Sequence, residues 1–271
     1  MIPRFNMHVH TSWSDGKNTP EEMILAALAA GCKAIGFSDH SYTAFDPVPA
    51  MAKDALPLYR EEIAALREKY RGQIAVYCGI EQDFYTEEPA EGVDYVIASV
   101  HYIKKDGELF PVDESAEALK EAAQRLYKGD YIALAEDYYS HVAAFAGRGQ
   151  YTIVGHFDLI TKFNEGSVLF DERDPRYIAA ARAALEACAD RRMIFEINTG
   201  AMFRGYRTAP YPAMPLLEMI REVGGNVLYS GDSHRAEGIL WGFDTALEAA
   251  KKAGFQQMFA LTADGLELFA L

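Results

Sequence analysis

The chain has 271 residues, half of them apolar and 24% charged, a composition that supports a large buried core and excludes a disordered protein. Forty acidic residues outnumber 26 basic ones, and the net charge of −14 argues against general binding to nucleic acid, which selects basic surfaces. No apolar run approaches the roughly 20 residues of a membrane span, and the N-terminus lacks the pattern of a secretory signal. We therefore expect a cytoplasmic protein with no membrane or nucleic-acid partner.

Seven short segments rich in β-branched and aromatic residues predict buried strands. In chain order they are Arg4–His10, Ala34–His40, Ile74–Asp83, Val93–His101, Thr152–Asp158, Met193–Asn198 and Asn226–His234. The best-marked helix opens at Thr19-Pro20-Glu21-Glu22, a capping box with Pro at the first helical position, and closes at Gly31. Further helical patterns cover Leu56–Tyr70, Ala116–Tyr127, Asp130–Phe145, Pro175–Asp190, Pro212–Val223 and Phe243–Ala253.

This alternation of strands and helices predicts a parallel sheet wrapped by helices, either closed as a barrel or open and doubly wound. Polar residues at every strand end, and the lack of a glycine-rich phosphate motif after the first strand, favour the barrel. We expect an α/β fold, a distorted (β/α)7 TIM-like barrel, forming a single domain over residues 1–271. The irregular stretches Ser41–Ala55 and Thr199–Tyr211 are predicted substrate loops, and Cys32, Cys78 and Cys188 are predicted buried free thiols.

Six of the seven histidines lie at the C-terminal ends of predicted strands, a concentration that chance would not produce. The polar residues at these ends are His8, His10, Asp39, His40, Glu81, His101, His156, Asp158, Glu196, Asn198, Asp232 and His234. Because strand ends of a barrel meet on one face, we expect these side chains to form one metal site. Imidazole and carboxylate ligands without thiolate suit zinc, manganese or iron. By contrast, His141, Asp130, Glu136 and Asp137 lie in an amphipathic helix pattern and are assigned no site role.

The motifs together resemble one family. His8-Val9-His10-Thr11 with Ser14-Asp15-Gly16, Ser38-Asp39-His40, Gly79-Ile80-Glu81, Ser99-Val100-His101, Gly155-His156-Phe157-Asp158 and Gly231-Asp232-Ser233-His234 are similar to the polymerase and histidinol phosphatase (PHP) superfamily. The segments Gly155–Lys162 and Glu196–Arg204 look most like its histidinol-phosphatase branch. The resemblance implies a distorted barrel of seven β/α units and a phosphoesterase activity.

Carried over residue by residue, the resemblance implies two or three divalent metals and a set of ligands. The first metal would be held by His8, His10, Glu81 and Asp232, and Glu81 would bridge to a second held by His101 and His156. A third metal, completing a trinuclear centre, would be held by Asp15, His40 and His234. Asp39 and Glu196 are expected to orient ligands or water.

The chemistry expected from this layout is metal-assisted hydrolysis. Two metals about 3.5 to 4 Å apart can bridge a water, lower its pKa and present hydroxide to phosphorus. The ions also give the site the positive charge that an anionic substrate needs in so acidic a protein. Lys162, Arg204 and Arg207 are predicted to stabilise the phosphoryl group, and either Asp158 or a metal-bound water would protonate the leaving group. Tyr42, Phe45, Asp83 and Tyr102 are candidate contacts to an amino alcohol bearing an imidazole.

The function that the resemblance implies is hydrolysis of L-histidinol phosphate in histidine biosynthesis. Other members of the superfamily act on nucleotides, other small phosphate esters or DNA ends, and the scaffold alone does not fix the substrate. The low content of Lys and Arg argues against a nuclease. A non-catalytic metal-binding module is disfavoured because every expected ligand is present. The sequence leaves the oligomeric state open.

Overall fold

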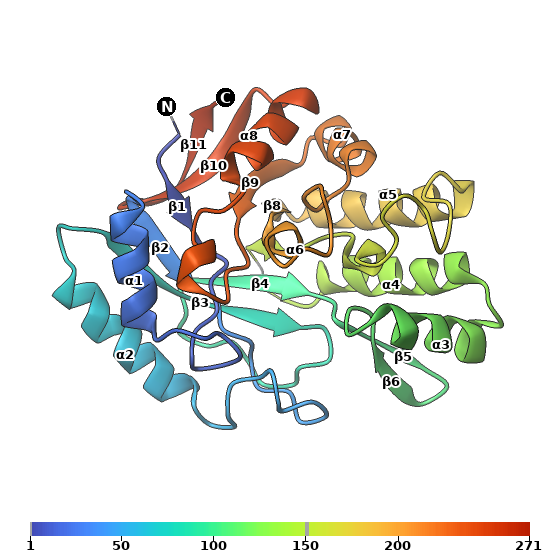
Figure 1. Cartoon of the computed structure of the whole chain (residues 1–271), viewed down its shortest axis with the longest axis horizontal. Coiled ribbons are helices and arrows are strands. Elements are labelled where there is room, and N and C mark those ends of the chain that lie inside the picture. The colour runs from blue at the N-terminus through green and yellow to red at the C-terminus, as the bar shows by residue number, and fades with distance from the viewer. Residues whose placement is uncertain (1, 150–151) are drawn as a thin grey trace.

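The computed structural model describes residues 2–149 and 152–271, and its centre is a nearly closed barrel of parallel strands. Seven strands pair in the order β1-β2-β3-β4-β7-β8-β9. They are β1 (Phe5–Asn6), β2 (Ala34–Phe37), β3 (Ala75–Asp83), β4 (Tyr95–Ser99), β7 (Ile153–Val154), β8 (Ile194–Asn198) and β9 (Asn226–Ser230). The predicted seven-stranded barrel is therefore confirmed, and Figure 1 shows helices surrounding it.

The barrel closes between its first and last strands at the end where the site lies. Each neighbouring pair is parallel, as in the register of Phe5 with Ala34. Beyond β1 and β9, Val9 bridges Ser233 in parallel. The Ser233 N–H donates to His8 O at 3.0 Å, and the His10 N–H donates to Ser233 O at 3.0 Å. These bonds hold the segment after β1 against the segment after β9.

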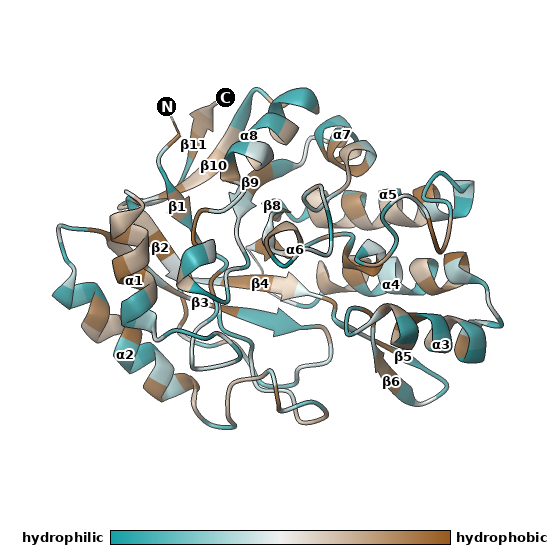
Figure 2. Cartoon of the chain, viewed as in Figure 1, coloured by the Kyte–Doolittle hydropathy of each residue, from teal (hydrophilic) through white to brown (hydrophobic). Residues whose placement is uncertain are grey.

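The helices agree with the periodic patterns in the sequence. They are α1 (Pro20–Ala29), α2 (Leu56–Lys69), α3 (Ala116–Tyr127), α4 (Tyr131–Phe145), α5 (Pro175–Asp190), α7 (Met214–Glu222) and α8 (Phe243–Lys252). The predicted capping box of α1 is present, since Thr19 accepts from the Glu22 N–H and Glu22 accepts from the Thr19 N–H. The helices carry both hydrophilic and hydrophobic residues along their length (Figure 2), and their apolar residues pack toward the strands.

Five features of the fold were not predicted: two hairpins, one short α-helix and two 3-10 helices. Two antiparallel hairpins, β5 (Tyr102–Lys105) with β6 (Glu108–Pro111) and β10 (Gln257–Thr262) with β11 (Gly265–Ala270), follow β4 and α8. The short helix α6 (Gly200–Phe203) lies in a stretch predicted to be irregular. The one-turn 3-10 helices η1 (Leu159–Thr161) and η2 (Ala236–Gly238) follow β7 and β9. The hairpin β5–β6 matters below because it leads the chain back to the site.

Two further expectations concern side chains outside the site. The three cysteines are buried and free, as predicted. Asp137 of α4, to which the sequence assigns no site role, is half-buried: its side chain is 22% exposed and accepts a hydrogen bond from Tyr127 OH at 2.7 Å. Within the described part of the chain, no helix combines the length and apolar character that a membrane crossing requires.

Candidate metal centre

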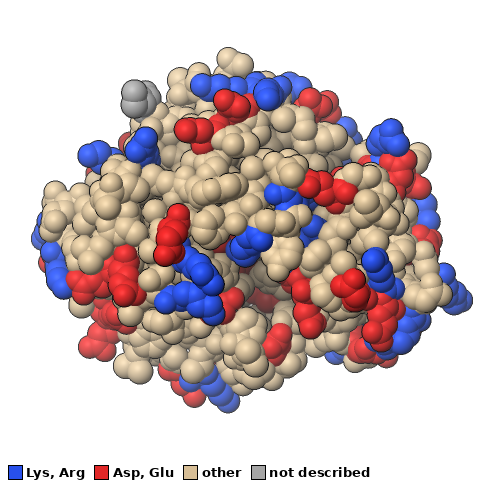
Figure 3. Space-filling view, viewed as in Figure 1, with Lys and Arg blue, Asp and Glu red and all other residues tan. Residues whose placement is uncertain are grey.

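A cavity of about 290 Å³ opens at the carboxyl ends of the barrel strands. Figure 3 shows a hollow near the middle of the molecular face, with acidic and basic side chains both lying around it. Seven of the predicted ligands line the cavity: Asp15, His40, Glu81, His101, His156, Asp232 and His234. The other two, His8 and His10, are fully buried, and both contact Glu81. The structure thus brings together all the ligands that the resemblance implied, although they span residues 8 to 234.

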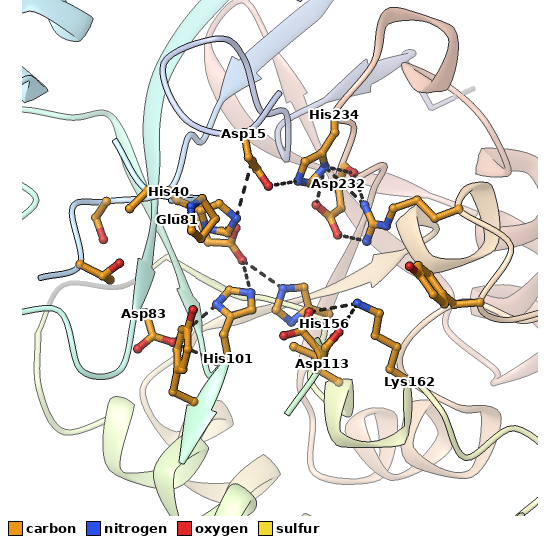
Figure 4. A pocket seen from close by; sticks show the side chains of 18 residues that line it. Asp15, His40, Glu81, Asp83, His101, Asp113, His156, Lys162, Asp232 and His234 are labelled. Carbon is orange, nitrogen blue, oxygen red and sulfur yellow. Dashed lines mark hydrogen bonds and ion pairs between the residues drawn. The ribbon is translucent and has the colours of Figure 1, made fainter. Parts of the chain in front are cut away.

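Glu81 on β3 is the centre of the cluster, as Figure 4 shows. Its Oε2 lies within 3.3 Å of three imidazole nitrogens, namely His8 Nε2, His10 Nε2 and His40 Nδ1. Its Oε1 faces the other way, 3.0 Å from His156 Nε2 and 3.5 Å from His101 Nε2. Because each carboxylate oxygen faces a different group of imidazoles, Glu81 has the arrangement of a ligand that bridges two ions.

Two aspartates complete the cluster on the side of β1 and β9. Asp232 Oδ1 lies 3.4 Å from His10 Nε2 and 3.5 Å from His234 Nδ1. Asp15 Oδ2 lies 3.2 Å from His234 Nε2, and Asp15 Oδ1 lies 4.0 Å from His40 Nε2. Most of these distances between oxygen and nitrogen atoms are longer than a hydrogen bond. A cation could therefore lie between the carboxylates and the imidazoles.

The ligand atoms fit divalent ions. Three groups have all their donor atoms within 4.8 Å of one another: His10, Asp15, His40 and His234; His8, His10 and Asp232; and His40, Glu81 and His101. Several buried donor atoms lack a hydrogen-bond partner, among them His8 Nε2, His10 Nε2, Glu81 Oε2, Asp15 Oδ1 and His156 Nδ1. Buried polar atoms are costly unless something pairs with them, and cations at these positions would pair with most of them. The donors are nitrogen and oxygen only, a set that suits zinc, manganese or iron.

The carboxylates create a strongly negative potential at the cluster. Burial lowers the pKa of His10, but its close contacts with the Asp232 and Glu81 carboxylates outweigh burial and raise that pKa to about 10. Burial likewise lowers the pKa of His101, yet the Glu81 and Asp83 carboxylates raise it to about 9. The same potential that would hold protons on these imidazoles attracts divalent cations, which compete with the protons.

We expect the metal-free protein to lose thermal stability as the pH rises from 6.5 towards 10. A raised folded-state pKa stabilises the fold fully below the unfolded value of 6.5, and this contribution disappears as the pH passes the folded values of about 9 for His101 and about 10 for His10. Differential scanning fluorimetry of chelator-treated protein between pH 6 and pH 10 measures this. Metal-loaded protein is the control, since ions replace the protons. A Tm of the chelated protein that rises over this range would contradict the expectation.

Two buried carboxylates hold the ligands in place. Glu196 on β8 accepts from His8 Nδ1 at 2.8 Å and from the His156 N–H at 2.6 Å. Because an ionised carboxylate only accepts, His8 carries its proton on Nδ1 and keeps Nε2 free for a metal. Asp39 accepts from the Thr11 N–H and from Ser14 Oγ, both at 2.7 Å, and so fixes the loop that carries Asp15. Both residues occupy the orienting positions expected from the sequence.

Glycines allow the backbone to approach the ligands closely. A Cβ on Gly16 would lie 2.5 Å from the carbonyl carbon of His10, so only glycine lets the Asp15 loop return to the His10 segment. A Cβ on Gly200 would lie 2.8 Å from the Asp232 Cβ. Asp232 itself has φ +45°, an unusual conformation for a residue with a side chain, and such strain is common where a side chain is aimed at a functional site.

The four predicted catalytic residues separate into two pairs. Lys162 and Arg204 line the cavity. Arg204 Nη2 donates to Asp232 Oδ2 at 2.8 Å, which places the guanidinium beside the ligands. Asp158 and Arg207 do not line the cavity, which corrects the expectation that they contact substrate.

Asp158 and Arg207 lie behind the cavity wall for identifiable reasons. Strand β7 ends at Val154, so the two-residue alternation that would align Asp158 with His156 does not continue, and Asp158 instead accepts from the Ala213 N–H at 2.9 Å. Arg207 turns away to donate to Thr161 O at 3.2 Å. Its guanidinium lies 4.7 Å from the centre of the Tyr211 ring.

The predicted substrate contacts are also divided. Asp83 and Tyr102 line the cavity, whereas Tyr42 and Phe45 do not. Phe45 packs edge-on against Tyr102, with ring centroids 4.8 Å apart, and so supports that wall from outside. The remaining lining residues fall into two groups. Those in the two stretches predicted to be substrate loops are Ser41, Thr43, Pro49, Ala50 and Tyr206, whereas Asp113 and Leu159 were not predicted. Asp113 follows the β5–β6 hairpin and Leu159 begins η1, and the sequence patterns predicted neither element.

Comparison with known proteins agrees with this geometry. The family model of the PHP domain matches residues 6–200. A protein of Deinococcus radiodurans named "Probable histidinol-phosphatase" is 31% identical over 258 residues, covering 91% of this chain and 92% of that protein. The histidinol-phosphatase of Bacillus subtilis is 27% identical over 267 residues, covering 89% of this chain and 97% of that protein.

A solved structure shares the fold. The histidinol phosphate phosphatase of Lactococcus lactis, complexed with zinc, L-histidinol and phosphate, superposes with a TM-score of 0.70 at 23% identity, covering 98% of this chain and 100% of that chain. Together with the family match over most of the sequence, these relatives establish what the strand-end motifs implied: the chain belongs to the PHP domain family.

Proposed function

We propose that this protein is a metal-dependent phosphomonoesterase that hydrolyses L-histidinol phosphate to L-histidinol and phosphate. The observation that carries the proposal is the convergence of buried, unpartnered imidazole and carboxylate atoms around Glu81 in an open cavity. The names of the relatives favour histidinol phosphate over nucleotides and other small esters. The step would belong to the biosynthesis of histidine, in the cytoplasm.

We propose that the site holds two or three divalent ions, with zinc, manganese and iron as candidates. His8, His10, Glu81 and Asp232 would hold the first, and Glu81, His101 and His156 the second. Asp15, His40 and His234 would hold the third and make the centre trinuclear. When bound, such ions supply Lewis acidity and activate water for attack on phosphorus.

The cavity cations bind and orient the phosphate. Arg204 is held by two contacts to Asp232, through the carboxylate at 2.8 Å and the backbone carbonyl at 3.0 Å, so its guanidinium is fixed before substrate arrives. A fixed donor stabilises charge that develops on phosphoryl oxygens without reorganising. Lys162 also lines the cavity, where Figure 4 shows it facing Asp113, and it provides the second positive charge.

Asp158 is not placed to protonate the leaving group. Its side chain is fully buried outside the cavity lining. Burial raises its pKa above the ordinary value, but a proton on Asp158 would have no direct path to an ester oxygen in the cavity. We therefore assign proton delivery to water in the cavity and regard Asp158 as a support for Arg207 and the segment at Ala213.

A phosphate-release screen across amino alcohol phosphates, sugar phosphates and nucleotides tests the proposed substrate. We expect kcat/KM for L-histidinol phosphate to exceed that for each sugar phosphate and nucleotide by at least about 100-fold, because the cavity would pair with both phosphate and amine. The assay measures inorganic phosphate released by protein reconstituted with zinc or manganese. A nucleotide or sugar phosphate hydrolysed as fast as L-histidinol phosphate would contradict the proposal.

A further inference from the structure

A second pocket, of about 490 Å³, opens at the amino end of the barrel, away from the metal centre. The last turn of α2, the start of β3 and the turn of the β10–β11 hairpin form its walls. It lies at the end of the barrel where the arrow of β3 begins in Figure 1. Strand β3 extends from Ala75 at this pocket to Glu81 at the cluster, which is about 20 Å at the usual rise per residue. A small molecule bound here therefore does not contact the reacting atoms.

Positive side chains dominate the lining of this pocket. Lys33, Arg67 and Arg71 line it, and Glu68 is the one carboxylate among the described lining residues. This local excess of positive charge contrasts with the net charge of −14 on the whole chain. A cleft lined by cations raises the local concentration of anions, even on a protein whose remaining surface repels them.

Arg67 is held in one orientation and still has donors to offer. Its Nε donates to Val76 O at 2.7 Å, and its Nη2 bonds to the Asp94 carboxylate. Asp94 also accepts from the Cys78 N–H at 2.7 Å and does not line the pocket. In the described part of the chain, no group accepts from Arg67 Nη1. A guanidinium fixed in this way can donate to an anion without first being ordered.

Lys33 and Arg71 are exposed and can move to meet a ligand. No described residue accepts a hydrogen bond from the Lys33 ammonium. Arg71 pairs with Glu68, but the two side chains are 75% and 63% exposed, and such a pair contributes little and exchanges readily. A Cβ on Gly72 would meet no atom within 4 Å, so the space beside these cations is open.

The pocket also offers apolar surface. Ala75, Tyr77 and Ala263 line it and are partly or fully exposed. The Tyr77 hydroxyl donates to Thr262 O at 2.9 Å, which holds the ring beside the hairpin turn. The volume of about 490 Å³ lies within the range of roughly 300 to 1,000 Å³ that is usual for small-molecule sites. A simple inorganic anion would leave most of this volume unfilled.

We propose that this pocket is a second ligand site, separate from the metal centre, which binds a small organic anion. The anionic group would lie among Lys33, Arg67 and Arg71, and an aromatic or aliphatic group would pack against Tyr77 and Ala263. The proposal does not depend on the phosphatase activity, because none of these residues lines the cavity at the metal centre. It assigns the amino end of the barrel to an effector, while the carboxyl end carries the reaction.

The test is isothermal titration of the metal-loaded protein with 4-bromobenzoate, an aromatic carboxylate. We expect the double variant Lys33→Gln/Arg71→Gln to raise the Kd at least about 10-fold, because two charged hydrogen-bond donors are lost. The Tm of the double variant should equal that of the wild type, since both side chains are exposed. Equal Kd values for the two proteins would overturn the site.

Two further variants separate a binding role from a general effect of charge. Glu68→Gln removes the carboxylate that competes for Arg71, so the Kd should fall by about 2- to 5-fold. A weaker affinity for this variant would overturn the assignment. Lys251→Gln/Arg173→Gln removes two positive charges at exposed positions outside both pockets and should leave the Kd unchanged. A loss equal to that of Lys33→Gln/Arg71→Gln would show that net charge alone controls binding and would also overturn the assignment.

The bromine atom locates the ligand directly. Anomalous scattering from a crystal soaked in 4-bromobenzoate should place bromine beside Tyr77 and Ala263. A bromine peak at the metal centre alone, or no binding to the wild-type protein at about 10 mM, would overturn the proposal. The neutral analogue 4-bromobenzyl alcohol should bind at least about 10-fold more weakly, because it lacks the charge that the cations recognise. Equal affinity for the two compounds would contradict a site for anions.

Discussion

Removal of divalent ions from the purified protein is expected to lower phosphate release from aryl phosphates and from L-histidinol phosphate by at least about 10³-fold, since metal activation supplies several kcal/mol of transition-state stabilisation. The physical reason lies in the cluster around Glu81. Its Oε2 lies 3.2 Å from His8 Nε2 and 3.3 Å from His10 Nε2, and all three buried atoms lack a hydrogen-bond partner. Elemental analysis before chelation should find two or three transition metals per chain. Activity should return when one of the candidate metals is added back.

The choice of metal can be determined in the same experiment. Adding zinc, manganese or iron separately to the chelated protein, and measuring both bound metal and phosphate release, identifies which ion supports turnover. A protein purified without metal, whose activity does not respond to a chelator, would contradict both the metal centre and the mechanism built on it.

Replacement of Glu81 by Gln should have the largest effect of any single substitution. Each oxygen of Glu81 faces its own set of imidazoles, so the change would weaken two metal positions together and place an amide donor where a carboxylate accepts. We expect kcat/KM to fall by at least about 10³-fold, beyond the 10- to 100-fold typical of a residue that only supports a ligand. Elemental analysis should find at least one metal fewer per chain.

The matched control for this variant is Glu61→Gln, an equivalent change at an exposed position of helix α2. It should leave metal content and kcat/KM at wild-type values, because Glu61 lies outside the cavity lining. If Glu81→Gln kept its full metal content and activity, Glu81 would not be a bridging ligand, and the arrangement of the centre would have to be revised.

The metal ligands were predictable from the sequence because each follows a strand whose pattern is clear. In a parallel barrel the ends of such strands meet, so residues as distant as His8 and His234 can be assigned to one site without any contact information. The resemblance to the PHP superfamily then assigned these ligands to three metal positions. The supporting role of Glu196 was also predictable, since Glu196 lies in the C-terminal half of β8, the strand that pairs with β7 just before His156.

The substrate side of the cavity was less predictable because it is built by short, irregular elements. Asp113 reaches the cavity only because the β5–β6 hairpin returns the chain to His101. The sequence does contain a signal for this hairpin. Asp106-Gly107 is a dipeptide typical of tight hairpin turns, and both residues have the positive φ that such a turn requires. In the second hairpin the loop residues are Ala263 and Asp264, and Gly265, which follows them, has positive φ.

The error over Asp158 has a different origin. Its position after His156 suggested that both side chains would point the same way, but this holds only while the strand remains extended. The chain enters the η1 turn immediately after Asp158, and the side chain is directed into the protein instead. His156 also lies beyond the end of β7 but still reaches Glu81, so the strand pattern predicted the neighbourhood of the site correctly and the direction of the Asp158 side chain wrongly.

The seam of the barrel gives the ions a mechanical role in addition to a chemical one. Strand β1 has only two residues, and β1 and β9 meet through the bonds between Val9 and Ser233 and their neighbours. The ligands of the expected first ion come from both sides of this seam, His8 and His10 from one side and Asp232 from the other. A cation bound there would link the segment after β1 to the segment after β9. Metal binding would therefore also stabilise the closure of the barrel.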